Sequence, residues 1–494
     1  MRRKIGDIAM LLRDLVESAD AESIHAESDI DISGISYDSR NVKSGDLFFA
    51  VRGFQSDGHS FAGEAAEKGA VCIICEEPPE AAVPYVIVPD SRRALALASA
   101  KWFGDPAAKL TVIGVTGTNG KTTVTNLIKQ ILEKATGEKV GLIGTNRNMI
   151  GGRELHAERT TPESYETQEL LAMMAAEGCR YAVMEVSSHA LLLDRVYGIG
   201  FEVGVFTNLS PDHLDFHASI EDYAEAKSRL FAVSQRSAVN IDDAYAQKMI
   251  GAAAGQVFTY AVKNDSANLV AKSITLHADR VEFCALMPGK LNRVELRIPG
   301  IISVYNAMSA ISAALMLGLD IEAIAPVLSE CEGVKGRAEI VPVDRDFSVL
   351  IDYAHTPDAL RNIITTVQGY AQGRVVTLFG CGGDRDSTKR PVMGAIAAQL
   401  SDFVVVTSDN PRTEEPGAII DAILSGMKGT QTPYEVIENR REAIRWALEN
   451  ARAGDVLILA GKGHETYQIL GKEKRHFDER EVVAEYVNGA LGDN

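Results

Sequence analysis

The feature that most constrains this fold is a glycine-rich loop placed between a buried strand and a helix. The apolar run 110–115 predicts the strand, and residues 124–133 predict the helix. The loop between them reads Gly117-Thr118-Asn119-Gly120-Lys121-Thr122-Thr123. Backbone N–H groups of such a loop, with the N-terminus of the following helix, face a phosphate. The pattern predicts ATP binding, and the alternative is a glycine turn that only starts a helix.

Two side chains of the loop have expected roles. Lys121 would contact the β- and γ-phosphates, and the Thr122 hydroxyl would reach Mg²⁺. The general phosphate-loop pattern has glycine five residues before Gly120, where this chain has Val115.

Strand-like runs alternate with helical patterns along most of the 494 residues, which predicts an α/β protein with largely parallel sheets. This length exceeds what one hydrophobic core usually holds. A helix over 91–103 ends at Gly104-Asp105-Pro106, and another buried strand is expected at 347–353. We therefore expect three domains, 1–107, 108–337 and 338–494.

Charge and cysteine content exclude some classes of protein. Asp and Glu number 68 against 50 Lys and Arg, a formal charge of −18, so we expect neither nucleic acid nor an anionic membrane as a partner. No run of about 18 uncharged apolar residues predicts a membrane span. Cys72 and Cys75 lie in one strand-like run on opposite faces, so we expect reduced, structural thiols rather than a redox or zinc pair.

Three residues outside the loop are candidates for metal chemistry. Glu185 ends a predicted strand over 181–186, where it could hold Mg²⁺ or act as an ordinary cap. His213 follows another strand in a polar cluster, although most histidines are structural. Lys227 lies in a helical stretch over 221–232 and by itself indicates a solvated surface lysine.

The string from Thr116 to Thr122 resembles the ATP loop of the Mur ligase family, including the shifted first glycine. The resemblance implies a UDP-binding α/β domain, a central P-loop ATPase domain with a mainly parallel sheet, and a C-terminal Rossmann-like domain. It also implies that Glu185 holds one Mg²⁺, while His213 and Lys227, carbamylated to N6-carboxylysine, serve a second. A lysine crowded by charge becomes less basic, and only the neutral amine reacts with CO₂.

The resemblance extends to the rest of the nucleotide site. It places Asn306 at the adenine, Arg337 at the phosphates and Asp352 at the ribose. His355, in Asp-x-x-His-x-Pro, is placed near the phosphates, and an ordinary cap is the alternative for both residues of this string. The residues expected to take part in catalysis are Lys121, Lys227 and His355.

Asp409-Asn410-Pro411-Arg412 follows a predicted strand, and Pro411 fixes a turn that aims Arg412. A guanidinium can grip a carboxylate through two parallel hydrogen bonds. The tetrapeptide resembles the diaminopimelate-adding branch of the family, and lysine-adding relatives lack the arginine. Asp409 or Glu465 suits the distal ammonium of meso-diaminopimelate, and a surface turn is the alternative. Further residues matching that pocket are Arg385, Asn410 and Gly461.

The first domain resembles the family's UDP-recognising segment. The residues implied near the uridine diphosphate are Tyr37, Ser39, Phe54, Gln55 and Ser56. The residues implied at the muramoyl-dipeptide are Thr160, Thr161, Ser187 and Arg195. Arg159 and Leu193 depart from the family pattern, which has asparagine and glutamine there, so contacts to the dipeptide differ at these two positions.

The implied activity is that of an ATP-dependent amide ligase. It would add meso-diaminopimelate to the D-glutamyl residue of UDP-N-acetylmuramoyl-L-alanyl-D-glutamate through an acyl phosphate, for peptidoglycan and hence cell shape and division. We expect a cytoplasmic monomer. The alternatives are a lysine-adding ligase, a folylpolyglutamate synthetase and a P-loop NTPase that moves a partner.

Overall fold

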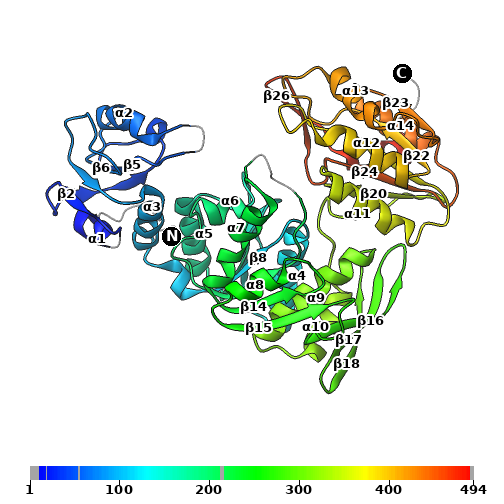
Figure 1. Cartoon of the computed structure of the whole chain (residues 1–494), viewed down its shortest axis with the longest axis horizontal. Helices are drawn as coiled ribbons and strands as arrows, with labels where there is room; N and C mark the ends of the chain where they lie inside the picture. The colour runs from blue at the N-terminus through cyan, green and yellow to red at the C-terminus, as the bar shows by residue number, and fades with distance from the viewer. Residues whose placement is uncertain (1–9, 18, 54–55, 212–215, 490–494) are drawn as a thin grey trace.

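The computed structural model describes residues 10–17, 19–53, 56–211 and 216–489. Three α/β units follow one another along the chain, each built on its own sheet. In Figure 1 the first and third units lie on opposite sides of the central one. The predicted fold class, an α/β protein of three domains, is confirmed.

The N-terminal unit contains a five-stranded sheet in the order β2-β7-β6-β5-β4. Its elements are β1 Met10–Leu11, α1 Leu12–Val16, β2 Ser23–His25, β3 Asp31–Ile32, β4 Gly34–Ser36, β5 Asp46–Phe49, α2 Ala62–Glu67, β6 Cys72–Cys75, β7 Tyr85–Ile87 and α3 Ser91–Trp102. Cys72 and Cys75 face two different hydrophobic clusters, as the alternation of a strand requires. Burial raises the pKa of the Cys72 thiol to about 12 and that of Cys75 to about 11, and both are free, which fits structural thiols.

The central unit has an eleven-stranded sheet in the order β11-β10-β9-β12-β8-β13-β14-β15-β16-β17-β18. The strands from β9 to β16 in this order are parallel, and both edges are antiparallel. Its elements are β8 Thr111–Thr116, α4 Lys121–Thr136, β9 Val140–Ile143, β10 Asn148–Ile150, β11 Arg153–Leu155, α5 Ser164–Ala176, β12 Tyr181–Glu185, α6 Ser188–Leu192, β13 Phe201–Phe206, α7 Ile220–Ala232, β14 Ser234–Asn240, α8 Ala246–Ala252, β15 Gln256–Ala261, β16 Leu269–Leu276, β17 Val281–Met287, β18 Lys290–Leu296, α9 Ile301–Met316 and α10 Ile321–Ser329.

The C-terminal unit has a six-stranded sheet in the order β19-β20-β24-β21-β22-β23, parallel except at β19. Its elements are β19 Glu339–Val341, β20 Ser348–Asp352, α11 Pro357–Gln368, β21 Val375–Phe379, α12 Lys389–Leu400, β22 Phe403–Val406, α13 Pro416–Gly426, β23 Tyr434–Val436, α14 Arg440–Glu449, β24 Val456–Ala460, β25 Tyr467–Leu470, β26 Glu473–His476 and α15 Glu479–Val487. The carboxyl ends of β20, β21, β22 and β24 therefore meet at one edge, where ligands bind in such sheets.

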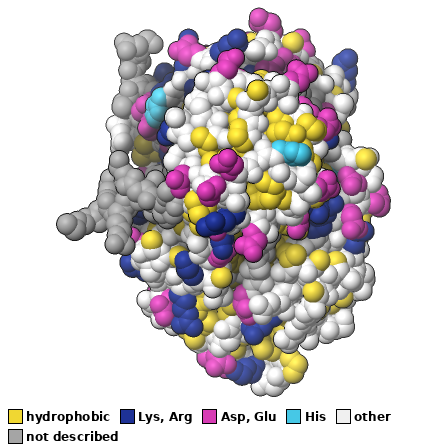
Figure 2. Space-filling view, turned by 90° about the vertical axis from the view of Figure 1, so that its left-hand side faces the viewer, with side chains coloured by type: hydrophobic (Ala, Val, Ile, Leu, Met, Phe, Trp, Pro, Cys, Tyr) yellow, Lys and Arg dark blue, Asp and Glu magenta, His cyan; other side chains and the backbone are white. Residues whose placement is uncertain are grey.

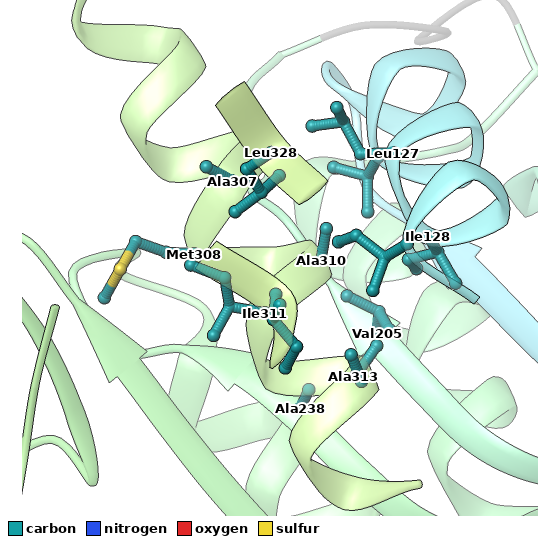
Figure 3. Close-up of a cluster of buried hydrophobic side chains, with 14 of the residues drawn as sticks. Leu127, Ile128, Val205, Ala238, Ala307, Met308, Ala310, Ile311, Ala313 and Leu328 are labelled. Carbon is teal, nitrogen blue, oxygen red and sulfur yellow. The ribbon is translucent and has the colours of Figure 1, made fainter. Parts of the chain in front are cut away.

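The core of the central unit explains why the phosphate loop is held firmly. Leu127 and Ile128 of α4 pack against small residues of α9 and against Val205 and Ala238 of the sheet (Figure 3). Alanines on α9 let the two helices approach the strands closely. Helix α4, which begins at the loop, is thus fixed from two sides.

One predicted boundary is wrong. The apolar run before Tyr305 suggested a strand, with a helix from Ala307, whereas α9 begins at Ile301. Gly300, with φ of 90°, turns the chain into the helix six residues earlier. Asn306 consequently lies inside α9, and its side chain points from a rigid element.

The surface agrees with the mixed charge of the sequence. On the face in Figure 2, acidic, basic and hydrophobic side chains are interspersed. Among the helices of the described residues, none is long and apolar enough to cross a membrane.

Candidate active site

The phosphate loop joins β8 to α4, as the sequence predicts. Gly117 and Gly120 have φ of 152° and 89°. A Cβ on Gly120 would lie 2.5 Å from Oδ1 of Asn306, and one on Gly117 would collide with the Thr207 hydroxyl. Both positions therefore require glycine, because the loop passes close to neighbouring side chains.

Glu185 ends β12, beside the strand that leads into the loop, and is 1% exposed. Its Oε2 accepts hydrogen bonds from the hydroxyls of Thr122 and Thr145, both at 3.0 Å, and its Oε1 accepts from the Thr145 amide at 2.8 Å. A carboxylate and a threonine hydroxyl thus meet at the start of α4. These are the oxygen donors that Mg²⁺ takes together with phosphate oxygens, so the residues present fit this ion.

Lys227 is buried, with 1% exposure, so the surface position that the sequence alone favours for it is wrong. Its Nζ donates to the carbonyl oxygen of Gly117 at 3.0 Å and lies 4.3 Å from the centre of the Tyr223 ring. Helix α7 brings this lysine to the phosphate loop from a distant part of the sequence. Lys121 donates to the carbonyls of Gly117 and Thr118.

A cavity of about 340 Å³ opens between the central and C-terminal units at this loop. One end is lined by the phosphate loop, Thr145, Thr160 and Glu185. The lining also includes the apolar side chains Pro299, just before α9, and Ile363 of α11, while Asn306 of α9 lies beside Gly120 of the loop. A lining that combines the phosphate loop with apolar side chains suits a triphosphate and a flat base.

The C-terminal unit closes this cavity with Arg337, Asp352 and His355. Arg337 Nη2 donates to the Thr122 hydroxyl at 3.3 Å, and its guanidinium lies over the Tyr353 ring at 4.8 Å. Burial raises the pKa of Asp352, although Arg337 and the Ala338 amide oppose this. The structure therefore brings the predicted nucleotide residues of both units to one cavity.

A second polar cluster lies at the carboxyl ends of β22 and β24. Asn410 donates through Nδ2 to Glu465 Oε2 at 2.9 Å, and its Oδ1 accepts from Lys462 Nζ at 3.1 Å. Gly461 has φ of 112°, and a Cβ there would lie 2.6 Å from Asp409 Oδ2. Lys462 and Arg440 lower the pKa of the buried Asp409 carboxyl, although burial itself raises it. Asp409 and Glu465 are thus two carboxylates held side by side.

Arg412 has φ of 55°, and its backbone is tied to the β25–β26 hairpin through Ile469 and Gly471. Its Nη1 donates to the carbonyl of Gly383 at 2.8 Å. Among the residues that the structure describes, its Nε and Nη2 make no hydrogen bond. This edge is the one that grips a carboxylate with two bonds. Arg385 lies exposed on the same loop as Gly383.

The predicted residues for the UDP-muramoyl-dipeptide are divided between two units. The Tyr37 hydroxyl donates to Glu166 of α5 at 2.6 Å, and Ser39 donates to Glu64 at 2.9 Å. Ser56 is exposed, whereas Phe54 and Gln55 lie outside the described residues.

The remaining dipeptide residues lie next to Glu185. Thr161 donates to the carbonyl of Glu185 at 2.8 Å and accepts from the Ser187 amide at 3.1 Å. Thr160 lies 3.0 Å from the Thr145 hydroxyl. Arg195 donates to the carbonyl of Thr161 at 3.2 Å. Hydrogen bonds through Thr145 and Glu185 therefore connect the four predicted residues to Thr122 of the phosphate loop.

Three guanidinium groups converge on Glu163 near Thr161. Arg195 lies 2.7 Å, Arg159 2.9 Å and Arg92 3.7 Å from its carboxylate. One carboxylate neutralises only one of the three, so this region carries excess positive charge that suits an anionic substrate. Arg159, the departure noted in the sequence, belongs to this cluster.

Comparison with known proteins identifies the family. The Mur ligase middle domain matches residues 115–314, the Mur ligase glutamate ligase domain matches 336–463, and the Mur ligase catalytic domain matches 31–102. The chain belongs to the Mur ligase family.

Individual Mur ligases resemble this chain over nearly its whole length. The UDP-N-acetylmuramoyl-L-alanyl-D-glutamate–2,6-diaminopimelate ligase of Caldanaerobacter subterraneus is 49% identical over 96% of this chain and 98% of its own. The ligase of the same name from Clostridium tetani is 46% identical over 97% and 99%. A solved structure of a ligase with this name has a TM-score of 0.72 and 31% identity, covering 98% of this chain and all of that one.

Sequence reasoning missed two residues of this Mur ligase site. Thr145 supplies two of the hydrogen bonds to Glu185. It lies just after the carboxyl end of β9, and ligands often bind at such strand ends, so its position could have indicated it. Lys462 is fully buried between Asn410 and Glu465. It lies between Gly461 and Glu465, which the resemblance places at the amino-acid pocket, but nothing in this segment indicates that the Lys462 ammonium points inward.

His213 lies outside the described residues, so its predicted place at the second metal stays a prediction. Within the described ranges, no group of three or more His, Cys, Asp or Glu side chains could hold a metal by itself.

Proposed function

We propose that this Mur ligase adds meso-diaminopimelate to the D-glutamyl residue of UDP-N-acetylmuramoyl-L-alanyl-D-glutamate, with ATP converted to ADP and phosphate. The observation that carries this proposal is that Arg412 and Asp409 follow β22 and Glu465 follows β24, at the sheet edge where β20 ends in Asp352 of the nucleotide cavity. A distal centre that bears both a carboxylate and an ammonium is the one feature that separates diaminopimelate from lysine. One guanidinium edge and two carboxylates match it.

The two sites are connected through the backbone. The Gly461 amide donates to the carbonyl of Asp352 at 3.0 Å, and the rings of Tyr353 and His464 lie 4.9 Å apart. An amino acid held by Arg412 and Asp409 would thus lie at the same edge of the C-terminal sheet as Asp352 of the nucleotide cavity. This arrangement supports transfer of an activated acyl group to the free amine of that amino acid.

The proposed reaction has two steps. The γ-carboxylate of the D-glutamyl residue attacks the γ-phosphorus of ATP, which gives an acyl phosphate and ADP. The amine then attacks the acyl carbon, and the tetrahedral intermediate expels phosphate to leave the amide. Phosphoryl transfer depends mainly on positioning and on neutralising charge. The loop amides, Lys121 and Arg337 would bind the phosphates, and the cluster around Glu163 would hold the α-carboxylate of the D-glutamyl residue, which leaves the γ-carboxylate free to attack.

We propose that Thr122 and Glu185 hold Mg²⁺, which would neutralise phosphate charge when bound. The Lys227 ammonium shares the Gly117 carbonyl with Lys121. Carbamylation would replace a positive charge at Lys227 by a negative one and supply two oxygens for a second ion. His355 donates from Nδ1 to the Tyr353 carbonyl at 2.8 Å, which fixes its ring at the cavity wall.

The experiment measures phosphate release with ATP, Mg²⁺ and the UDP-muramoyl-dipeptide, adding meso-diaminopimelate or L-lysine in separate reactions. We expect release and tripeptide product with diaminopimelate and little with lysine. Release with lysine instead would overturn the specificity. Release indifferent to both amino acids would return the NTPase alternative, and glutamylation of a folate would favour the synthetase.

Location and assembly are further parts of the proposal. Use of ATP and six free cysteines, five of them buried, support a cytoplasmic enzyme of peptidoglycan synthesis and so of cell division. All three substrate regions are supplied by one chain, which supports a monomer. Light scattering at micromolar concentration would test this, and a dimer mass would contradict it.

A further inference from the structure

A buried ion pair lies directly beneath the proposed diaminopimelate pocket. Arg440 begins α14 and Glu479 begins α15, and both side chains are fully buried. The guanidinium donates from Nε and Nη2 to Glu479 Oε1, at 2.9 and 2.7 Å. Since Arg440 is 1% exposed, it cannot itself touch a substrate.

The same guanidinium reaches two strand ends. Its Nη2 donates to the carbonyl of Ala460 at 2.7 Å, and its Nη1 donates to the carbonyl of Ser408 at 3.3 Å. The residues that follow are Gly461 and Asp409, which both belong to the pocket. Strands β22 and β24 are not neighbours, because β21 lies between them. Arg440 therefore ties together two turns that no strand pairing connects.

A second buried cation repeats this connection one layer nearer the pocket. Lys462 Nζ donates to Asn410 Oδ1 at 3.1 Å and to Glu465 Oε2 at 3.2 Å, and lies 3.7 Å from Asp409 Oδ1. Without these two cations, the carboxylates of Asp409, Glu465 and Glu479 would repel each other. Arg440 thus holds the backbone at the start of both turns, and Lys462 compensates the charge of their carboxylates.

Stability alone does not explain such a pair. Removing two charges from water costs about as much as their attraction returns, and apolar replacements of buried ion pairs are often neutral or stabilising. What apolar side chains cannot reproduce is the pair of hydrogen bonds to the carbonyls of Ser408 and Ala460. A binding site whose groups are held within about half an ångström needs such support from behind.

We propose that Arg440, oriented by Glu479, is a positioning residue that sets the spacing of Asp409 and Gly461 and thereby the affinity for the amino-acid substrate. The inference rests on the proposed function, since it names diaminopimelate as that substrate. It predicts that removing the Arg440–Glu479 pair weakens the binding of diaminopimelate and leaves the binding of ATP and of the UDP-muramoyl-dipeptide unchanged.

The test uses the double variant Arg440→Met/Glu479→Met, which removes both charges together and leaves no orphaned ion in the core. We expect a folded protein whose KM for meso-diaminopimelate rises at least about tenfold, the effect of losing one or two charge-assisted hydrogen bonds. The KM values for ATP and the UDP-muramoyl-dipeptide should stay within about twofold. Arg440→Lys keeps the charge but cannot reach all three acceptors, so its KM should be intermediate.

Arg374 and Asp455 give a matched control. This pair, at 2.6 Å, lies at the opposite end of the same sheet, where both residues precede β21 and β24. Arg374→Met leaves the 2% exposed Asp455 without its cation, so it should lower the melting temperature and leave the KM for diaminopimelate unchanged.

Hydrogen exchange gives a readout independent of activity. Amides at 409, 410, 412 and 461–465 should exchange faster in the double variant and not in Arg374→Met. Unchanged KM and unchanged exchange in the double variant would overturn the positioning role, as would a parallel rise of all three KM values. A wild-type protein without diaminopimelate-dependent turnover would instead overturn the proposed function, and exchange would still decide the positioning role.

Discussion

Lys121 and Lys227 donate to the same acceptor, the carbonyl oxygen of Gly117, at 2.8 and 3.0 Å. Two ammonium groups so close repel each other, most strongly where water is excluded. Binding of ATP would draw Lys121 toward the phosphates. Carbamylation would make Lys227 an anion and reverse the interaction.

We therefore predict that Lys227 carries a carbamate that the reaction needs. Lys227→Ala should lower kcat at least about a hundredfold, the scale seen when a group that organises transition-state charge is removed. Added ¹³C-bicarbonate should give a carbamate carbon signal in the wild-type NMR spectrum that is absent from the variant.

Lys129 provides the control for this prediction, because it is a buried lysine of α4 that pairs with Glu133 away from the loop. Lys129→Ala should keep both the carbamate signal and kcat. Full activity in Lys227→Ala would contradict the assignment, as would an identical ¹³C spectrum in both proteins.

Gly120→Ala should weaken ATP binding specifically. The new Cβ would press on Oδ1 of Asn306 at 2.5 Å and displace the side chain proposed to contact adenine. Gly137→Ala is the matched control, since its φ of 72° is similarly left-handed and nothing lies within 4 Å of its Cβ. Both variants should lose about 1–2 kcal/mol of stability. Only Gly120→Ala should raise the KM for ATP, by at least about tenfold, and equal KM values in the two would contradict the argument.

Much of the fold follows from local patterns in the sequence. The strands that contain Val112, Val376 and Ile458 are short apolar runs bounded by glycine or charged residues, and such runs predict buried parallel strands. The phosphate loop was predictable because one contiguous segment contains strand, loop and helix. The turn at Asp409–Arg412 was likewise predictable, because it follows a predicted strand and contains Pro411, which restricts the backbone before Arg412.

Other features depend on contacts between distant segments. Lys227 is buried because α7 packs beside β8. The sequence around Lys227 does not indicate this packing. The link from Arg440 to Ser408 and Ala460 spans three separate segments. The start of α9 was missed because an apolar run of this length has no period that separates a strand from a buried helix.

Arg412→Ala should reduce affinity for diaminopimelate more than for any other substrate. Its Nε–Nη2 edge is proposed to grip the distal carboxylate, and removing one partner of such a bond costs about 2–5 kcal/mol. We expect the KM for meso-diaminopimelate to rise at least about thirtyfold, measured by phosphate release at saturating ATP. Preference over L-lysine should fall by a similar factor.

Arg475→Ala is the control for this measurement. Arg475 lies on the β25–β26 hairpin that holds the Arg412 backbone, and its guanidinium pairs with Glu473 at the surface. Its removal should leave the KM unchanged within about twofold. A preference for diaminopimelate that survives Arg412→Ala would show that other groups read the distal carboxylate.

His464 should make stability depend on pH. Burial, helped by the cations Arg337 and Arg480, lowers the pKa of this histidine from 6.5 to about 4. Between these values the unfolded chain binds a proton that the folded protein does not, so stability rises with pH across this window. The contribution is fully present above pH 6.5 and is lost as the pH falls toward 4, up to about 3 kcal/mol.

The variant His464→Phe isolates this contribution, because it keeps a ring against Tyr353 and removes the titrating group. Urea unfolding of both proteins at pH 7, 5.5 and 4.5 gives the free energy of unfolding of each. Wild-type protein should lose more of it than the variant as the pH falls, because carboxylates common to both proteins cancel in the difference. Parallel pH profiles would mean that the folded protein accepts a proton at His464 as readily as the unfolded chain does.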